Sequence, residues 1–345
     1  MKHNDSYRLT LFPEIQQRHS TTTATMLLRT TIFSFCLIFL IALLSLSRIG
    51  ATEAKTAVLF GATGAVGNEV LRAILANNQL FTTLILVGRR PFPPKVNDLL
   101  SSSSDDHPLE VIKVEDVADL GIVDQHDELA VMKVDACFIA IGNAFPQQSD
   151  LYDWHVVEVT MAESMTRLCV QMQTTVITLF TAIDADQSDP EPYSEEELTK
   201  TGTPMGWWPV LAGTMRMMGW KEKAVATAAV KKATAAVQIP PSIRIFQPSN
   251  IITKELRYGW LDWTVFNFHA IFDPWLPTRY HSVTTELLAT AMVTDSVHIL
   301  SGKTPSASTT TVCGDVGVDG ATRFTYKDFV RIVAGEDVGE EKTEL

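Results

Sequence analysis

Residues 56–78 read TAVLFGATGAVGNEVLRAILANN, and this stretch decides the fold. Its first five residues, TAVLF, form a short apolar run of the kind that a parallel strand needs when both faces of its sheet are covered. The residues after the turn predict a helix, because their large apolar side chains fall on one face at helical spacing: Val70, Leu71, Ile74 and Leu75.

The glycine-rich turn GATGAVG lies between this strand and this helix. Glycines permit a tight turn and a close approach of the backbone to a pyrophosphate, whose charge meets the N–H groups of the helix N-terminus. Directly after an apolar strand, the turn predicts a dinucleotide-binding βα unit. The residues expected to hold the phosphates are Gly61, Thr63, Gly64, Ala65, Val66 and Gly67.

The second strand predicts which dinucleotide is bound. Residues 84–87 read LILV and are followed by Gly88, Arg89 and Arg90. Proteins that bind NAD usually carry an acidic residue about 20 positions beyond the glycine turn, where it accepts from the ribose hydroxyls. Two guanidinium groups attract a 2′-phosphate instead. We therefore expect NADP(H) as the cofactor; the alternative is a pair of solvated arginines at a strand end.

Further strands and helices alternate along the chain and predict an α/β fold, a doubly wound parallel sheet of the Rossmann type with five or six strands. The next strand end contributes Asp116 and Val117, where an Asp can accept from an adenine amino group, and the following one contributes Gly142 and Asn143. The stretches assigned to these strands and to one long helix are 109–114, 135–143, 174–186, 243–252 and, for the helix, 151–172.

The composition excludes several classes of protein. The chain has 345 residues, of which 46% are hydrophobic, and a formal net charge of -12. A largely disordered chain is excluded by the hydrophobic share, and non-specific nucleic-acid binding is disfavoured by the acidity. Four scattered cysteines are too few for a disulfide framework, and no metal-ligand spacing is present. A small-molecule substrate is the expected partner, and no oligomeric state follows from the sequence.

The N-terminal 54 residues read as a leader that precedes the domain. Residues 32–46, IFSFCLIFLIALLSL, carry no charge and suit the apolar region of a signal peptide better than a bilayer span of about 20 residues. Translation from Met26 gives a signal peptide of ordinary proportions, and a long N-terminal region before the apolar one serves equally well. The alternative is an uncleaved signal anchor at residues 31–47, the only form in which we expect membrane attachment.

The other end of the chain supports entry into the secretory pathway. Residues 336–345 form an acidic tail that ends in Lys342-Thr343-Glu344-Leu345. This ending resembles the Lys-Asp-Glu-Leu retrieval signal of the endoplasmic reticulum, with Thr in place of Asp. We expect a leader at 1–54, one NAD(P)-binding domain at 55–335, and residence in the lumen of the endoplasmic reticulum.

The motifs resemble the atypical, extended-type short-chain dehydrogenase/reductases, and among them the Tat-interacting-protein oxidoreductase group and its fungal mitochondrial relatives. The resemblance spans roughly residues 56–300 and implies NADPH binding on a Rossmann fold, with a small C-terminal region that builds the substrate pocket. It adds Pro248 to the cofactor site. The matching stretches are VLFGATGAVGNEVL, LILVGRRPF, DACFIAIGNA and FQPSNI.

The catalytic machinery departs from the family pattern of a Ser and a Tyr-x-x-x-Lys, in which the Lys lowers the pKa of the phenol and the Tyr exchanges a proton with the carbonyl. Thr181 stands where the resemblance places the Ser. Lys221 stands where it places the Lys, but Met217 occupies the Tyr position. Tyr193 lies in an inserted segment that can fold into the site. For Lys221 and Lys223 a solvated helix face is the alternative to a catalytic role.

Two stretches, residues 204–220 and 258–280, are dense in Trp, Phe and Met, and they predict core packing, a lid over a hydrophobic substrate or a membrane-facing patch. Two functions follow from the whole pattern. The first is an NADPH-dependent reductase of a small or lipophilic carbonyl or enone. The second is a non-catalytic NADP(H)-binding protein that regulates a partner or senses redox state.

Overall fold

The computed structural model divides the chain into two compact units, Met1–Glu53 and Ala54–Leu345, and the residues it describes all belong to the second. The described residues are 54–101, 109–117, 119–142, 151–185, 194–199, 207–236, 238–253, 271–302, 315–316 and 319–335. The predicted leader, Asn143, Tyr193 and the acidic tail lie outside them.

A mostly parallel sheet of eight strands forms the centre of this unit, in the order β3-β2-β1-β4-β5-β6-β10-β9. All neighbouring strands from β3 to β10 run parallel, and β9 is antiparallel to β10. The strands are β1 Lys55–Phe60, β2 Phe81–Val87, β3 Glu110–Val114, β4 Ala136–Ile139, β5 Val176–Phe180, β6 Ser242–Phe246, β9 Asp315–Val316 and β10 Thr322–Phe324.

The strand order confirms the predicted doubly wound Rossmann fold. The chain moves outward from β1 to β3, returns to the other side of β1 at β4 and continues outward, so the order reverses between β1 and β4. In register, Val58 of β1 lies between Ile85 of β2 and Cys137 of β4.

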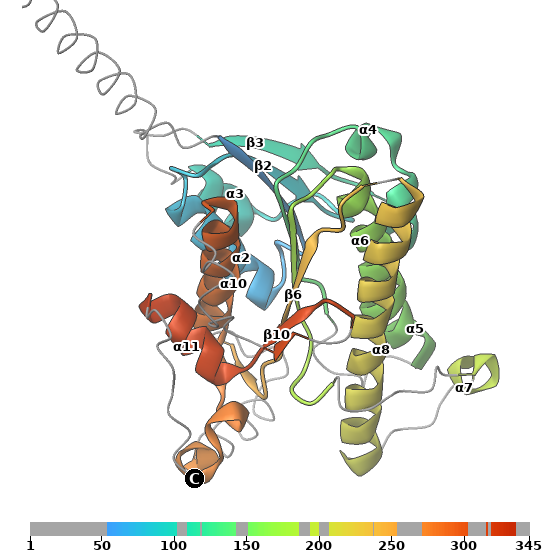
Figure 1. Ribbon diagram of the computed structural model, residues 1–345, viewed down its shortest axis with the longest axis vertical. Helices are drawn as coiled ribbons and strands as arrows, with labels where there is room; N and C mark the ends of the chain where they lie inside the picture. Colours follow the sequence, from blue (N-terminus) through green and yellow to red (C-terminus); the bar gives the residue numbers. More distant parts are fainter. Residues whose placement is uncertain are drawn as a thin grey trace, which may run out of the picture. The chain divides into compact units, whose positions relative to one another are not determined.

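Helices cover both faces of the sheet (Figure 1). On one face lie α2 (Ala65–Ala76), α3 (Pro94–Ser101), α10 (Thr285–Leu300) and α11 (Tyr326–Ala334), and on the other lie α6 (Met161–Gln171) and α8 (Trp207–Ala235). The remaining helical segments are η1 Leu120–Gln125, α4 Asp127–Ala130, α5 Leu151–His155, η3 Val156–Thr160, α7 Glu195–Thr199, η4 Asp273–Trp275 and η5 Thr278–Tyr280.

The alternation of side chains along β1 explains why its sequence is apolar throughout. Ala57 and Leu59 pack into the hydrophobic cluster under α2 and α10, whereas Val58 and Phe60 pack into the cluster under α6 and α8. All four side chains are completely buried. A strand with helices on both faces has no polar side, so an uninterrupted apolar run is its signature.

One predicted strand is in fact two strands, and the observed β4 and β5 are shorter than the stretches 135–143 and 174–186 assigned to them. Residues 243–252 divide into β6 and β7 (Ile251–Ile252), and β7 pairs with β8 (Val283–Thr284) in a separate two-stranded sheet. Pro248 lies between the two strands and has no N–H to donate to a neighbouring strand. Its carbonyl instead accepts from the N–H of Ile183, which follows β5.

The predicted long helix over 151–172 is present, with a change of pitch inside it. Between α5 and α6, Val156–Thr160 forms a π-helical turn, and the N–H of Met161 donates to the carbonyl of Val156. Across the described parts of the chain, we find no helix with the length and apolar character that a bilayer crossing requires.

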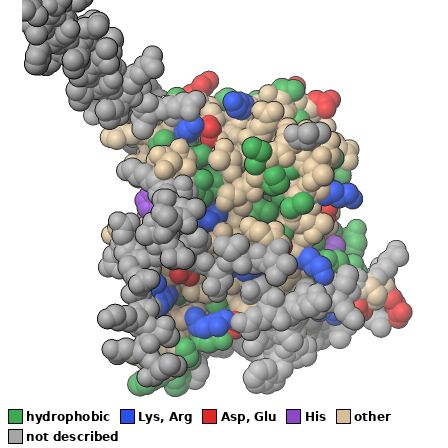
Figure 2. Space-filling view, viewed as in Figure 1, with side chains coloured by type: hydrophobic (Ala, Val, Ile, Leu, Met, Phe, Trp, Pro, Cys, Tyr) green, Lys and Arg blue, Asp and Glu red, His purple; other side chains and the backbone are tan. Residues whose placement is uncertain are grey.

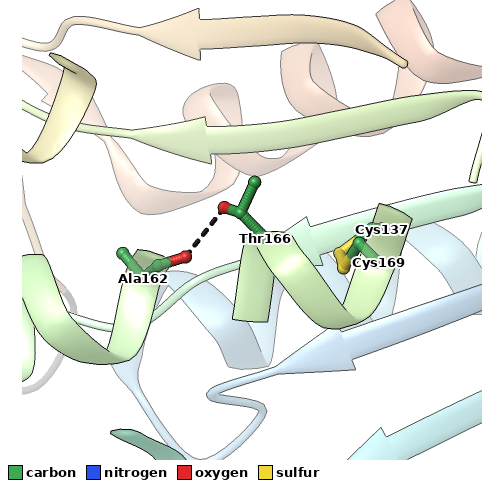
Figure 3. Close-up of a disulfide and its surroundings, with 4 residues drawn as sticks. All are labelled: Cys137, Ala162, Thr166 and Cys169. Carbon is green, nitrogen blue, oxygen red and sulfur yellow. Dashed lines mark hydrogen bonds between the residues drawn. A yellow bond between two sulfur atoms is a disulfide. The ribbon is translucent and has the colours of Figure 1, made fainter. Parts of the chain in front are cut away.

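A disulfide joins Cys137 of β4 to Cys169 of α6 (Figure 3). The two Cα atoms are 6.3 Å apart, and both side chains are completely buried in the cluster under α6 and α8. The sequence indicated no disulfide framework, and in the part of the chain that the structure describes this one bridge is found. It forms because α6 crosses back over β4 and brings together two residues that are 32 positions apart.

The glycine turn has almost no room for side chains at its first and last glycines. A Cβ on Gly61, whose φ is +87°, lies 2.5 Å from the carbonyl oxygen of Ala140, and a Cβ on Gly67 lies 1.9 Å from that of Gly61. The absence of a side chain at these two positions lets β1, β4 and the start of α2 approach one another this closely.

We expect Gly67→Ala to lower the free energy of unfolding by about 3 kcal/mol or more, because no backbone atom can move 1 Å or more without disturbing β1. Urea unfolding followed by circular dichroism measures the loss. Gly320→Ala is the control for steric contact, since nothing lies within 4 Å of the Cβ position there; its positive φ (+76°), which Gly67 does not share, should by itself cost only about 1–2 kcal/mol. Equal losses in both variants contradict the prediction.

Candidate functional site

A cleft of about 440 Å³ opens at the carboxyl ends of β1, β2 and β4, where the strand order reverses. Ligands of doubly wound folds bind at this switch point. Three chain segments and three apolar side chains form the walls: Gly61–Gly64, Val87–Pro93, Ala140–Gly142, Leu120, Val157 and Met161.

The first wall offers backbone N–H groups to an anion. Gly64 is the N-cap of α2, and it brings no side chain to accept from the first turn of the helix. That first turn contains no acidic residue. A Cβ on Gly64 has only the carbonyls of Gly61 and Ala140 nearby, at 3.3 and 3.7 Å. The helix end therefore presents unpaired donors and a positive dipole end, as a pyrophosphate requires.

The predicted phosphate-binding residues divide into three groups. Gly61, Thr63 and Gly64 line the cleft. Ala65 lines a neighbouring cavity of about 180 Å³ that shares Thr63, Gly64 and Pro93 with the cleft. Val66 and Gly67 are buried, so they can contribute only backbone groups.

The second wall carries positive charge. Arg89 and Arg90 follow β2, are exposed and line the cleft. The segment that bears them is anchored to β3, since the N–H of Gly88 donates to the Val114 carbonyl at 3.0 Å and that of Val117 to the Gly88 carbonyl at 3.1 Å. A phosphate group that enters this end of the cleft meets two guanidinium groups on an anchored support.

Asp116 and Val117 lie at the end of β3, outside the residues that line the cleft. Val117 is buried among apolar side chains. Asp116 is exposed and has a φ of 60°, in the left-handed region that costs a non-glycine residue about 1 kcal/mol or more. Of the other predicted cofactor residues, Gly142 lines the cleft, and Pro248 lies between β6 and β7.

Lys221 of α8 is completely buried and forms an ion pair with Glu158 of the π-helical turn. Its Nζ lies 2.9 Å from Glu158 Oε2, 3.3 Å from the carbonyl oxygen of Ile141 and 5.4 Å from the centroid of the Phe180 ring. Glu158 is 2% exposed. The solvated alternative therefore does not apply to Lys221, whereas Lys223, two positions along the same helix, is exposed.

Glu158 and the apolar wall are functional candidates that the sequence reasoning missed. Glu158 shares a helix face with the apolar residues Trp154, Met161 and Met165. A lone carboxylate on an apolar face was the signal in the sequence that could have marked it as a functional candidate. Val157 and Met161 could not be recognised as wall residues, because their place at the cleft depends on how the π-helical turn meets β4.

The Thr181 hydroxyl lies after β5 and donates to Glu222 Oε1 at 2.5 Å. The same carboxylate accepts from Gln247 Nε2 at 3.0 Å and from Arg323 Nε at 2.8 Å. Burial raises the pKa of Glu222 above its ordinary value, against the hydrogen bonds from Gln247 and Thr181 and the charge of Arg323. Thr181 is thus part of a buried network that joins β5, α8, β6 and β10.

Met217, at the position of the missing Tyr, is completely buried in an apolar cluster with Trp154, Val159 and Met218. Next to Trp154 of this cluster, the ring of His155 lies 4.5 Å from that of Trp220, which packs against the cluster, and burial lowers the pKa of His155. Nothing in the described surroundings of residue 217 offers a phenol to Lys221.

Asp184, which follows β5, binds the side chains of two residues of η5. It accepts from the Tyr280 hydroxyl at 2.9 Å and pairs with Arg279. The hydrogen bond to Asp184 raises the pKa of Tyr280. Asp184 has a φ of 61°, so this contact is made at some cost in backbone conformation. Tyr280 and Asp184 are 96 positions apart in the sequence, so their contact could not be predicted before the fold was known.

Charged side chains are mixed on the molecular surface. Figure 2 shows Lys, Arg, Asp and Glu side chains scattered among apolar ones on the face drawn, and the described residues there form no continuous basic patch. Within the described ranges, no three His, Cys, Asp or Glu side chains gather as a metal ion would require.

No family model matches the sequence, and no curated protein matches it. Similar solved structures do exist. One is a short-chain type dehydrogenase/reductase from Mycobacterium ulcerans, 12% identical, with a TM-score of 0.48 over 80% of this chain and 90% of that one. MoeE5, solved in complex with UDP-glucose and NAD, is 13% identical, with a TM-score of 0.44 over 82% of this chain and 81% of that one.

Pen from Bacillus thuringiensis is 9% identical, with a TM-score of 0.45 over 70% of this chain. This chain spans 64% of the length of that protein, less than two thirds. At these identities and TM-scores the likenesses assign neither a family nor an activity, and the Rossmann fold rests on the strand order described above.

Proposed function

We propose that this protein is an NADPH-dependent oxidoreductase of the atypical short-chain dehydrogenase type, acting on a small or lipophilic carbonyl or enone. One observation carries the proposal: the glycine cradle at the switch point and the pair Arg89 and Arg90 line the same cleft. The cradle suits a pyrophosphate and the arginines suit a 2′-phosphate, so the cleft matches both anionic parts of NADP(H).

The residues have separate roles in this proposal. The first N–H groups of α2 bind the pyrophosphate, and Arg89 and Arg90 bind the 2′-phosphate. Leu120, Val157 and Met161 give the cleft an apolar side that suits a nicotinamide ring and keeps water from it. When bound, NADPH supplies a hydride to the carbonyl carbon.

The proton for the carbonyl oxygen is the open part of the proposal. The Thr181 hydroxyl is engaged by Glu222, and Met217 has no proton to give. Tyr193, which lies outside the described residues, stays the predicted donor, with water as the alternative. An activated substrate such as an enone needs little acid help, which is why we place it among the expected substrates.

A second candidate function is a non-catalytic NADP(H)-binding protein that regulates a partner or senses redox state. The burial of Met217 favours it, because an apolar side chain fills the place from which a tyrosine assists catalysis in the resembling family. Both candidates require the same cofactor, so turnover separates them.

Replacing Arg89 and Arg90 together with Ser should weaken NADPH binding by about tenfold or more, because two charge-assisted contacts to the 2′-phosphate are lost. NADH lacks that phosphate, and its affinity should change by less than about threefold. Calorimetric titration of the purified protein with each nucleotide measures both values. Equal weakening of the two contradicts the assignment of the arginines.

The purified protein should oxidise NADPH in the presence of at least one member of a panel of aldehydes, ketones and enones, followed at 340 nm as nicotinamide absorbance. Gly64→Asp is the control, since it puts a side chain and a negative charge where the phosphates bind, and it should abolish both binding and turnover. NADPH binding without turnover above this control favours the non-catalytic function. Absence of NADPH binding removes both.

We also propose that the protein resides in the lumen of the endoplasmic reticulum; attachment to its membrane through residues 31–47 is the alternative. The Cys137–Cys169 disulfide supports the proposal, because structural disulfides form in oxidising compartments and are rare in the cytosol.

Protein expressed in cells should be protected from protease in intact microsomes, and its non-reduced digest should contain the peptides of Cys137 and Cys169 linked to each other. Carbonate extraction distinguishes a luminal protein, which is released, from an anchored one, which stays with the membrane. Protease sensitivity together with two free thiols at these positions contradicts the luminal placement.

A further inference from the structure

We infer that Glu158 is a positioning residue for the cofactor site: with Lys221 it forms a clamp on the carbonyl of Ile141 that holds the end of β4 in its cofactor-binding conformation. The clamp is defined as these two side chains and that carbonyl. The inference rests on the proposed NADP(H) site and adds to it a residue that has no counterpart in a Tyr-x-x-x-Lys motif.

The burial of the pair calls for a function. Lys221 is 0% and Glu158 2% exposed, whereas among the described residues the arginines of two other largely buried pairs, Arg244–Asp295 and Arg323–Glu222, keep 13% and 10%. Removal of both charges from water carries a large desolvation penalty, and well-packed apolar residues would often serve stability as well or better. Stability alone is therefore a poor reason for this pair.

The geometry connects the pair to the cleft. The Lys221 ammonium donates to Glu158 Oε2 at 2.9 Å and to the Ile141 carbonyl at 3.3 Å. Ile141 and Gly142 line the cleft. The Ile141 carbonyl belongs to the peptide group that joins these two wall residues. Because the Lys221 ammonium donates to it, the ammonium sets the orientation of that peptide group.

Gly142 brings the carboxylate close to the wall. A Cβ at this position would lie 3.3 Å from Glu158 Oε1 and 3.6 Å from Phe180 Cζ. The Glu158 carboxylate therefore lies close to the backbone of Gly142, and a side chain at residue 142 would require the carboxylate to shift by a few tenths of an ångström. The backbone there lies beside both the Glu158 carboxylate and the Phe180 ring.

The π-helical turn and the residue that follows it combine two functions, the cleft wall and the clamp, on one segment. Val157 and Met161 form part of the cleft wall, and Glu158 reaches Lys221. A π turn is rare and occurs most often at functional sites. Here it lets neighbouring residues of Val156–Thr160 serve the wall and the clamp together.

The test compares cofactor affinity with fold stability in the purified protein. The variants are Glu158→Gln, Lys221→Met and the double variant Glu158→Leu/Lys221→Met, with Lys223→Met as the exposed control on the same helix. NADPH affinity is measured by calorimetry and the melting temperature by circular dichroism. Each single variant removes one charge of the pair, leaves the other buried charge without its counter-ion and should lower the melting temperature.

The double variant decides the matter, because it removes both buried charges and should recover the melting temperature. Its NADPH affinity should still be about tenfold weaker than that of the wild type, since the Ile141 carbonyl has lost its donor. Recovery of affinity together with melting temperature overturns the inference, because the pair is then structural only. Lys223→Met should change neither quantity.

The failure of this inference is distinguishable from that of the proposed function. A wild-type protein that binds no NADPH refutes the site itself. A wild type that binds NADPH, loses affinity on substitution of Arg89 and Arg90, and keeps it in the folded double variant refutes the clamp alone. If both single variants fail to fold, the double variant still gives the answer.

Discussion

Gly67 in the first turn of α2 and the carbonyl of Gly61 at the end of β1 approach so closely that a methyl group at residue 67 would lie 1.9 Å from the oxygen. This contact sets the distance between helix and strand. Because Gly61 in turn touches the carbonyl of Ala140, the same approach brings the end of β4 to the cradle. The close approach of β1, β4 and α2 places the cleft, the N–H groups of the first turn of α2 and the arginine wall next to one another.

Much of the fold could be predicted because its determinants are local. The β1–turn–α2 unit is encoded in consecutive residues, and strands buried on both faces appear as continuous apolar runs. The prediction was wrong about residues 243–252, where Pro248 interrupts the strand. The strands β9 and β10 were missed, since Asp315–Val316 and Thr322–Phe324 are too short to show a period.

The candidate site also contains residues that the local sequence reveals and residues that meet only in the folded chain. Arg89 and Arg90 were recognisable because they directly follow a strand. Glu158 and Lys221 are 63 positions apart, and Glu222 and Arg323 are 101 apart, so only the folded chain shows that they meet. The burial of Lys221 had a local signal: Met217 and Val225, four positions away on each side, place it on the apolar face of α8, whereas Lys223 lies off that face.

The disulfide has a consequence for how the protein responds to its surroundings. Both sulfur atoms lie in the hydrophobic cluster between β4 and α6, where no part of Cys137 or Cys169 is exposed. Thiol–disulfide exchange requires direct attack by a thiolate on sulfur, so glutathione cannot reach this bond while the helix is docked. Fluctuations of the ambient redox potential should therefore leave the folded molecule unchanged, and the bond acts as a permanent fastening made once, during maturation.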